Sequence, residues 1–125
     1  MFAGVTPSMT IAREEIFGPV LSVLSWSDEA RMLDDVNAVD YGLTCSIWTN
    51  DLTTAHRVAM TVQVGYVWIN EVGRHFLGAP FGGVKQSGFG REECLEELLR
   101  FTQEKNIHVK LRHRSASLGA RPTPS

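Results

Sequence analysis

The stretch LGAPFGGVKQSGFGR, residues 77–91, decides how the rest of this chain is interpreted. Residues 73–90 hold six of the eleven glycines in the chain, and regular elements are predicted on both sides of them. Glycine tolerates positive φ and lets backbone approach another group closely. We therefore expect this loop to lie against a ligand, another chain or its own sheet.

Two phosphate-binding motifs resemble parts of this loop. Gly78 and Gly83 have the G-x-x-x-x-G spacing of a phosphate-binding loop, but that motif needs Lys directly after the second glycine. Here Val84 separates Gly83 from Lys85. The GFG that follows begins a G-x-G-x-x-G motif, but Glu93 stands where the third glycine belongs. Neither motif is complete, and composition favours a glycine-rich surface loop with positive φ.

Strand and helix patterns alternate before the loop. Residues 20–24 form a short, β-branched apolar run typical of a buried strand, and residues 44–49 and 65–70 predict two more strands. Residues 28–38 and 52–62 carry apolar side chains at helical spacing. This alternation predicts an α/β fold with a three-stranded parallel sheet and right-handed crossover helices.

After the loop, residues 91–102 predict a C-terminal helix, whose glutamates are more typical of a solvated face than of a metal site. Residues 106–111 alternate apolar and polar side chains, as an exposed or edge strand does. Such a strand has no obvious partner in this chain, so we expect it to pair with another chain or a missing segment. Residues 112–125 lack apolar surface and predict a disordered basic tail.

Composition restricts the classes of function. Hydrophobic residues make up 43% of the 125 residues, which is enough for a core, and no apolar run approaches the ~18 residues of a membrane span. No basic segment precedes Arg13, so no signal peptide is predicted. Cys45 and Cys94 predict two reduced thiols in a cytoplasmic protein. The net charge is −2, and residues 1–104 carry −7, which argues against nucleic acid as a partner.

The third predicted strand ends where a binding site is expected. In open parallel sheets, ligands bind beyond the carboxyl ends of the strands. The glycine loop leaves that end of the predicted strand at residues 65–70, next to Asn70 and Glu71. These two residues have a chemical role or are simply polar residues at a strand end, and the sequence leaves both interpretations open.

Two segments together resemble a known family. Residues 80–92, PFGGVKQSGFGRE, look like the PFGG-x-K-x-SG-x-GRE motif of the NAD(P)-dependent aldehyde dehydrogenases. Residues 14–20, EEIFGPV, are similar to the family's EEIFGPV motif. The resemblance covers roughly residues 1–111, in the family's order and approximate spacing. It implies that residues 1–104 are the C-terminal part of a catalytic domain and that residues 105–111 form an oligomerisation strand.

The same resemblance implies roles for four residues. Glu15 resembles the carboxylate that accepts hydrogen bonds from the nicotinamide-side ribose of NAD or NADP, and Phe17 resembles the aromatic residue beside the nicotinamide ring. From the residues alone, Glu15 reads as a surface carboxylate and Phe17 as a core aromatic. Phe76 and Phe81 lie where the family lines its substrate funnel. Arg74 and His75, in the variable part of the loop, are further candidates for substrate selection.

The chain lacks the motifs that carry the family's chemistry. Aldehyde oxidation needs a thiolate nucleophile, a general base and an oxyanion donor. The family places these, with its dinucleotide-binding fold, upstream of the EEIFGPV motif, and Cys45 and Cys94 do not match the nucleophile's surroundings. We therefore expect no catalytic residue and no metal site in this chain, and no turnover by the chain alone.

Three functional hypotheses follow. The first is the C-terminal portion of an aldehyde dehydrogenase, with a partial cofactor site, an aldehyde substrate in the full enzyme, and homo-oligomers formed through Asn106–Leu111. The second is a non-enzymatic module that self-associates through the same strand. The third is a nucleotide-binding or nucleic-acid-binding protein, which the broken loop motifs and the acidic body disfavour. The first predicts exposed apolar surface on the isolated chain.

Overall fold

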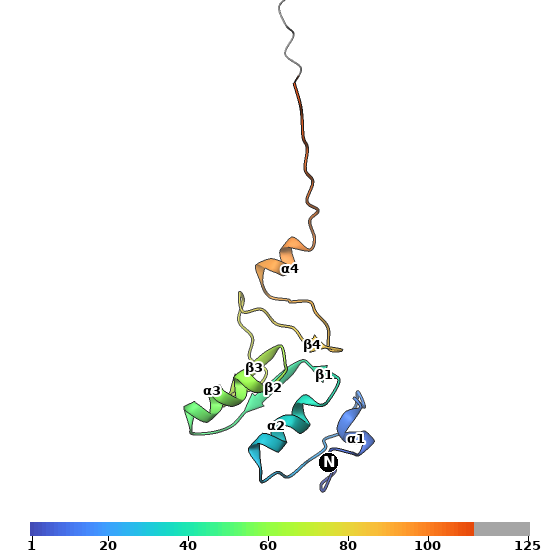
Figure 1. Ribbon diagram of the computed structural model, residues 1–125, viewed down its shortest axis with the longest axis vertical. Coiled ribbons are helices and arrows are strands. Elements are labelled where there is room, and N and C mark those ends of the chain that lie inside the picture. Colours follow the sequence, from blue (N-terminus) through green and yellow to red (C-terminus); the bar gives the residue numbers. More distant parts are fainter. Residues whose placement is uncertain (112–125) are drawn as a thin grey trace, which may run out of the picture.

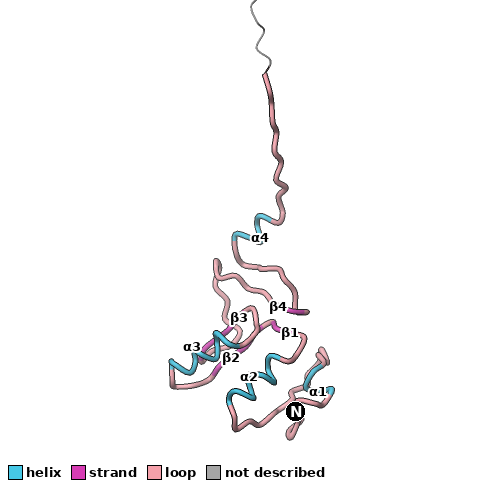
Figure 2. The backbone as a smooth tube through the Cα atoms, viewed as in Figure 1, coloured by secondary structure: helices cyan, strands magenta, loops and turns pink. Residues whose placement is uncertain are grey.

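The computed structural model describes residues 1–111, and the tail predicted at residues 112–125 lies outside them. The element order is α1 (Thr10–Arg13), α2 (Glu29–Asn37), β1 (Tyr41–Gly42), β2 (Thr44–Ile47), α3 (Leu52–Thr61), β3 (Tyr66–Ile69), β4 (Val84–Lys85) and α4 (Leu95–Leu99). Helices and strands alternate through the middle of the chain (Figure 1). Long loops occupy both ends (Figure 2).

A parallel β–α–β unit forms the centre of the fold. Strands β2 and β3 pair in parallel from Thr44 with Tyr66 to Ile47 with Ile69, and α3 connects them. This is the crossover that the alternating pattern predicted. The Asn70 amide closes the carboxyl end of the pair, because it accepts from the Thr49 N–H and donates to the Thr49 carbonyl, both at 2.9 Å.

One of the three predicted parallel strands, that of residues 20–24, is wrong. Residues 20–24 form no strand in the described structure and pair only with the N-terminus, through a parallel bridge between Phe2 and Ser22. The Phe2 N–H donates to the Leu21 carbonyl at 2.7 Å, and the Val23 N–H donates to the Phe2 carbonyl at 2.8 Å. Residues 20–24 therefore pair with the N-terminal segment and not with β2 or β3. The described strands form two sheets of two strands each.

The second sheet was not predicted. Strand β1 pairs antiparallel with β4, Tyr41 with Lys85 and Gly42 with Val84. Both strands contain two residues, which is too short for a period-two pattern to appear in a sequence. The pairing brings the glycine loop back to the start of β2.

The predicted helix at residues 91–102 is shorter in the structure. Helix α4 covers Leu95–Leu99. Glu92 cannot join it, because its backbone exchanges hydrogen bonds with Phe81 at 2.7 and 3.1 Å. Glu93 has φ +61°, a left-handed conformation that ends regular helix geometry. The strand predicted at residues 106–111 does not form either, because within residues 1–111 no second strand pairs with it.

The core is small and lies between the two longer helices and the parallel pair. Leu33 of α2 packs with Val58 and Val62, and partly buried side chains surround these three: Met32, Cys45, Ile47, Val64 and Val67. The Asn37 amide ties the helix ends together, because it donates to the Thr61 carbonyl at 3.1 Å and accepts from the Gln63 N–H at 2.8 Å. Arg57 of α3 adds an ion pair with Glu29 of α2.

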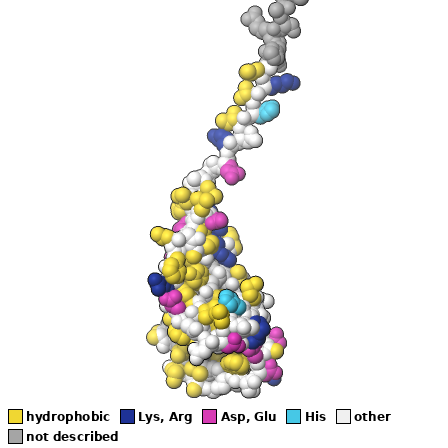
Figure 3. Space-filling view, turned by 90° about the vertical axis from the view of Figure 1, so that its left-hand side faces the viewer, with side chains coloured by type: hydrophobic (Ala, Val, Ile, Leu, Met, Phe, Trp, Pro, Cys, Tyr) yellow, Lys and Arg dark blue, Asp and Glu magenta, His cyan; other side chains and the backbone are white. Residues whose placement is uncertain are grey.

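Large apolar side chains remain exposed over much of the described surface, as the sequence predicted for the isolated chain. Phe17, Leu77 and Phe89 are each more than 90% exposed. Hydrophobic side chains cover much of the face in Figure 3 and continue up the C-terminal segment. Contiguous apolar surface of this kind marks contact with another segment or chain.

The acid stability of the chain is expected to depend in part on Asp51. Its carboxylate caps α3, accepting from the Thr54 hydroxyl at 2.6 Å and the Thr53 N–H at 3.0 Å. The hydrogen bond from Thr54 lowers the pKa of Asp51 below its ordinary 3.8. A lowered folded-state pKa stabilises the fold above the ordinary value, and that stability is lost as pH falls through the folded value.

Melting temperatures between pH 6 and pH 2.5 test this expectation. Asp51→Asn retains an N-cap acceptor but cannot titrate, so its melting temperature is expected to fall less steeply with acid. Asp34→Asn, at an exposed position of α2, is the matched control. Identical acid slopes for the Asp51 and Asp34 variants would contradict the expectation.

Lys85 is expected to stabilise the junction between β4 and α2. Its ammonium donates to the carbonyls of Asn37 at 2.7 Å and Val39 at 3.0 Å, at the carboxyl end of the helix. A cation there satisfies free carbonyls and complements the helix dipole. Lys85→Met is expected to lower the free energy of unfolding by about 1 kcal/mol in urea titrations. Lys105→Met, at an exposed position, serves as the control and should change little.

Candidate functional site

The two predicted cofactor residues lie in the loop after α1. Glu15 is exposed, and its carboxylate accepts no hydrogen bond from residues 1–111. Phe17 has φ +52°, and its ring is 93% exposed. A bulky residue in the left-handed region is strained, and such strain gathers at sites that bind something. Phe17 is therefore not the core aromatic that the residues alone suggested.

The segment of residues 71–81, the aromatic loop, packs its rings on strand β3. The Phe81 ring lies 5.6 Å from the Tyr66 ring and 4.4 Å from the His75 ring. Trp68, two residues after Tyr66, lies 4.9 Å from it and donates its indole N–H to the Arg74 carbonyl at 2.7 Å. Phe81 therefore belongs to a continuous aromatic surface.

Phe76 lies at the edge of this aromatic surface. Its side chain is 50% exposed, and the Arg74 guanidinium sits over its ring at 5.1 Å. Arg74 also pairs with Glu71 at 3.7 Å. Phe76 remains free to contact another molecule on its outer face.

A polar pair joins the aromatic loop to the segment before α4. His75 Nδ1 lies 2.9 Å from Glu93 Oε1. The Glu93 carbonyl also accepts from the Gly78 N–H at 2.7 Å. Glu93 was not among the predicted site residues, because nothing in the sequence separates it from its neighbouring glutamates. Tyr66 and Trp68 were also missed, although their i, i+2 spacing on one strand face was a usable signal.

The glycine loop is packed against its own chain. Arg91 donates to the carbonyls of Gly83 and Gly90, both at 2.7 Å. A phosphate cradle would turn backbone N–H groups inward, whereas here two carbonyls face the guanidinium. A Cβ on Gly83 would lie 2.6 Å from the Ser87 side chain. Glycine is needed at position 83 because the backbone is closely packed there, and at positions 78 and 88 because φ is positive.

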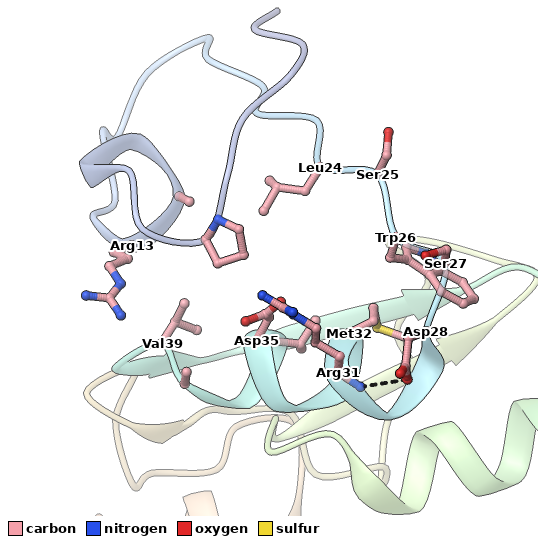
Figure 4. A pocket seen from close by; sticks show the side chains of 14 residues that line it. Arg13, Leu24, Ser25, Trp26, Ser27, Asp28, Arg31, Met32, Asp35 and Val39 are labelled. Atoms are coloured by element: carbon pink, nitrogen blue, oxygen red, sulfur yellow. Dashed lines mark hydrogen bonds between the residues drawn. The ribbon is translucent and has the colours of Figure 1, made fainter.

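One large cavity lies away from these residues. It has a volume of about 780 Å³ between the N-terminal segment and α2. Leu24 and Arg13 lie on one side and Arg31, Met32 and Asp35 on the other (Figure 4). A smaller cavity of about 320 Å³ includes Phe81 and the glycine loop in its lining. Neither lining contains Glu15, Phe17 or Phe76.

Cys45 is a poor nucleophile as placed, because burial raises the pKa of its thiol and lowers its thiolate fraction. Both Cys45 and Cys94 are free thiols. Cys94 directly precedes α4.

Within residues 1–111, no three His, Cys, Asp or Glu side chains are grouped as a metal site. No helix in the same range is long and apolar enough to span a membrane.

The structure brings Phe76 and Phe81 into one loop but does not join them to Glu15 and Phe17. No hydrogen bond, ion pair or ring contact among the described residues links the two pairs. Residues 14–17 follow α1, whereas the aromatic loop follows β3 on the other side of the parallel pair (Figure 1). The predicted cofactor and substrate residues therefore form two separate patches of this chain.

The chain belongs to the aldehyde dehydrogenase family, whose model matches residues 1–107. This confirms the family that the two motifs resembled. Aldehyde dehydrogenase tropH of Talaromyces stipitatus is 55% identical over 111 residues, which is 89% of this chain and 22% of that protein. The betaine aldehyde dehydrogenase of Sinorhizobium fredii is 49% identical over 109 residues, 87% of this chain and 22% of that protein.

Solved aldehyde dehydrogenases share the fold. KauB of Pseudomonas aeruginosa matches with a TM-score of 0.78 and 44% identity over 87% of this chain and 22% of its own. An aldehyde dehydrogenase of Bacillus cereus, solved as an NAD+ complex, matches with a TM-score of 0.70 and 42% identity over 75% of this chain and 20% of its own. The chain thus spans about a fifth of the length of the proteins it matches.

Proposed function

We propose that these residues form the C-terminal part of an NAD(P)-dependent aldehyde dehydrogenase that oxidises aldehydes to carboxylic acids. Family membership carries the proposal, together with the NAD+ complex of the Bacillus cereus relative. The chain supplies part of the cofactor site and part of the substrate funnel. The nucleophile, the general base and the rest of the dinucleotide site come from outside the 125 residues.

The residues present fit a nicotinamide cofactor. Glu15 is exposed and has no hydrogen-bond partner within residues 1–111, so its carboxylate is free to accept from two vicinal ribose hydroxyls. The ring of Phe17 is 93% exposed and held by an unusual backbone conformation, so it offers a flat apolar face to a nicotinamide ring. When bound, the cofactor accepts the hydride removed from the substrate. This chain's own contribution is to hold and orient it.

The aromatic loop forms one wall of the substrate funnel. Phe76 presents a half-exposed ring at its edge, and Phe81 anchors the loop on β3. Apolar walls exclude water and favour apolar aldehydes.

We also propose that the enzyme works in the cytoplasm. Neither Cys45 nor Cys94 forms a disulfide, which fits a reducing compartment.

A chimera tests the proposal. Residues 1–111 of this chain replace the matching residues of tropH, which is 55% identical to them, and NADH or NADPH formation is followed with a panel of aldehydes. Aldehyde-dependent reduction of either cofactor supports the proposal, and a folded chimera without turnover contradicts it. The 125-residue chain alone is expected to show no turnover.

Glu15 gives a sharper test in the same chimera. Glu15→Gln removes the charge that strengthens the ribose hydrogen bonds, so KM for the cofactor is expected to rise about tenfold. Glu14→Gln, at the neighbouring exposed position, is the matched control and should leave KM unchanged. Equal effects of the two substitutions would contradict a specific role for Glu15.

The second candidate function is a self-associating module without catalysis, and the exposed segment of residues 106–111 supports it. Residues 106–111 are exposed, and Ile107, Val109 and Leu111 are each at least 70% exposed. Sedimentation velocity of the 125-residue chain, with and without an Ile107→Lys substitution, measures association through this segment. An active chimera would set this candidate aside, whereas an inactive chimera with a self-associating chain would favour it.

A further inference from the structure

We propose that His75 and Glu93 form a positioning pair, which fixes the aromatic loop and thereby controls selection for ring-bearing aldehydes. The inference rests on the proposed role of this loop as a funnel wall. It concerns how the wall is held, and neither residue is assigned a step in the chemistry.

Glu93 holds the aromatic loop through two different groups. A carboxylate oxygen only accepts, so His75 Nδ1 carries the hydrogen in the 2.9 Å contact with Oε1. The Glu93 carbonyl accepts from the Gly78 N–H at 2.7 Å. Its own N–H donates to Glu97 Oε2 at 2.7 Å, which anchors it to α4. One residue therefore connects the loop to the helix at two points.

The ring of His75 contacts the rings of β3 and of the aromatic loop, so the restraint on His75 extends to them. Its imidazole stacks on Tyr66 at 6.0 Å with 16° between the planes, and it lies 4.4 Å from Phe81 and 5.9 Å from Trp68. A rotated imidazole would lose these contacts together. The hydrogen bond to Glu93 thus selects one orientation of the ring that sits at the centre of the aromatic surface.

Stability alone does not explain the pair. Glu93 has φ +61°, which is strained for a residue with a side chain. Its Oε2 atom is shielded from solvent and has no hydrogen-bond partner among the described residues. Both features destabilise the fold. Glu93 has both destabilising features and also orients the neighbouring His75 ring. This combination indicates that Glu93 serves function more than stability.

Hydrogen exchange of the 125-residue chain tests the positioning directly. Glu93→Ala and His75→Phe are expected to speed amide exchange within residues 76–81 about threefold, a modest factor because the pair is partly exposed. Glu93→Gln keeps an acceptor for Nδ1 and should stay near the unchanged chain. His56→Phe and Glu104→Gln, at exposed positions, are the controls. No protection of residues 76–81 in the unchanged chain, or no change in the variants, would overturn the proposal.

Kinetics of the active chimera test the consequence for selection. Glu93→Ala and His75→Phe are expected to raise KM for benzaldehyde about tenfold relative to KM for acetaldehyde. Glu93→Gln should restore most of the loss. A chimera without turnover would refute the proposed function, and the exchange experiment would still decide the positioning. An active chimera in which KM for benzaldehyde is unchanged would overturn this inference and leave the function intact.

Discussion

Leu33→Ala is expected to lower the free energy of unfolding by about 3 kcal/mol, because Leu33 lies at the centre of a small core. Leu33 is 8% exposed and packs on Val58 and Val62 between α2 and α3. Removing its branched end leaves a cavity that the two helices cannot close, because the Asn37 amide fixes their carboxyl ends. Urea unfolding followed by circular dichroism measures the loss.

The matched control is Leu52→Ala. Leu52 opens α3 and is 64% exposed, so removing its side chain is expected to cost less than about 0.5 kcal/mol. Equal losses at the two positions would mean that the cluster around Leu33 does not hold the helices together.

Gly65→Ala is expected to be the second large effect, destabilising the fold by about 3 kcal/mol through overpacking. Gly65 precedes β3, where the glycine loop crosses it. A Cβ there would contact the Gly82 carbonyl, with the carbonyl carbon at 2.7 Å and the Gly83 Cα at 2.9 Å. All three are backbone atoms, so relief requires the loop to move. In the tropH chimera, we also expect loss of aldehyde oxidation.

Gly73→Ala is the control that separates the effect of steric crowding at Gly65 from the effect of backbone strain. Gly73 has φ +76°, and nothing lies within 4 Å of a Cβ built on it. The substitution is expected to cost about 1 kcal/mol from the left-handed conformation alone. If Gly65→Ala proved no more destabilising than Gly73→Ala, the close crossing at Gly65 would be refuted.

The sequence predicted the elements whose partners are close along the chain. Helices α2 and α3 and strands β2 and β3 all appear within a few residues of their predicted bounds. Each has a local signal: the caps at Asp28 and Asp51, the apolar stripe of α3, and short apolar strands joined by one crossover. Local propensity and hydrophobic period are sufficient there.

The errors arose where distant contacts decide the structure. Residues 20–24 have the composition of a buried strand. In the structure they pair with the segment around Phe2, and the sequence alone does not indicate this partner. The predicted helix at residues 91–102 lost its first turn to the pairing of Phe81 with Glu92. Residues 106–111 have a strand pattern without a described partner. No sequence period encodes which segment lies opposite.

The candidate site was predicted mainly through resemblance. Two motifs indicated Glu15, Phe17, Phe76 and Phe81, and their roles remain predictions. The pairing of His75 with Glu93 follows from the path of the chain after β3, which the sequence does not specify. Tyr66 and Trp68 could have been predicted, because residues two apart on a strand place their side chains on the same face.

The antiparallel pairing of β1 with β4 has a consequence for the order of folding. The pairing of β2 with β3 spans only helix α3 and its flanking turns, whereas Tyr41 pairs with Lys85 across the whole of the β2–α3–β3 unit and the aromatic loop. Longer loops close more slowly and at greater entropic cost. During synthesis, the parallel unit is therefore expected to form while the glycine loop is still being made. The Asp40 carbonyl, which accepts from the Gln86 N–H, and the Gly42 N–H, which donates to Ser87 Oγ, then stay open to wrong partners until β4 is made.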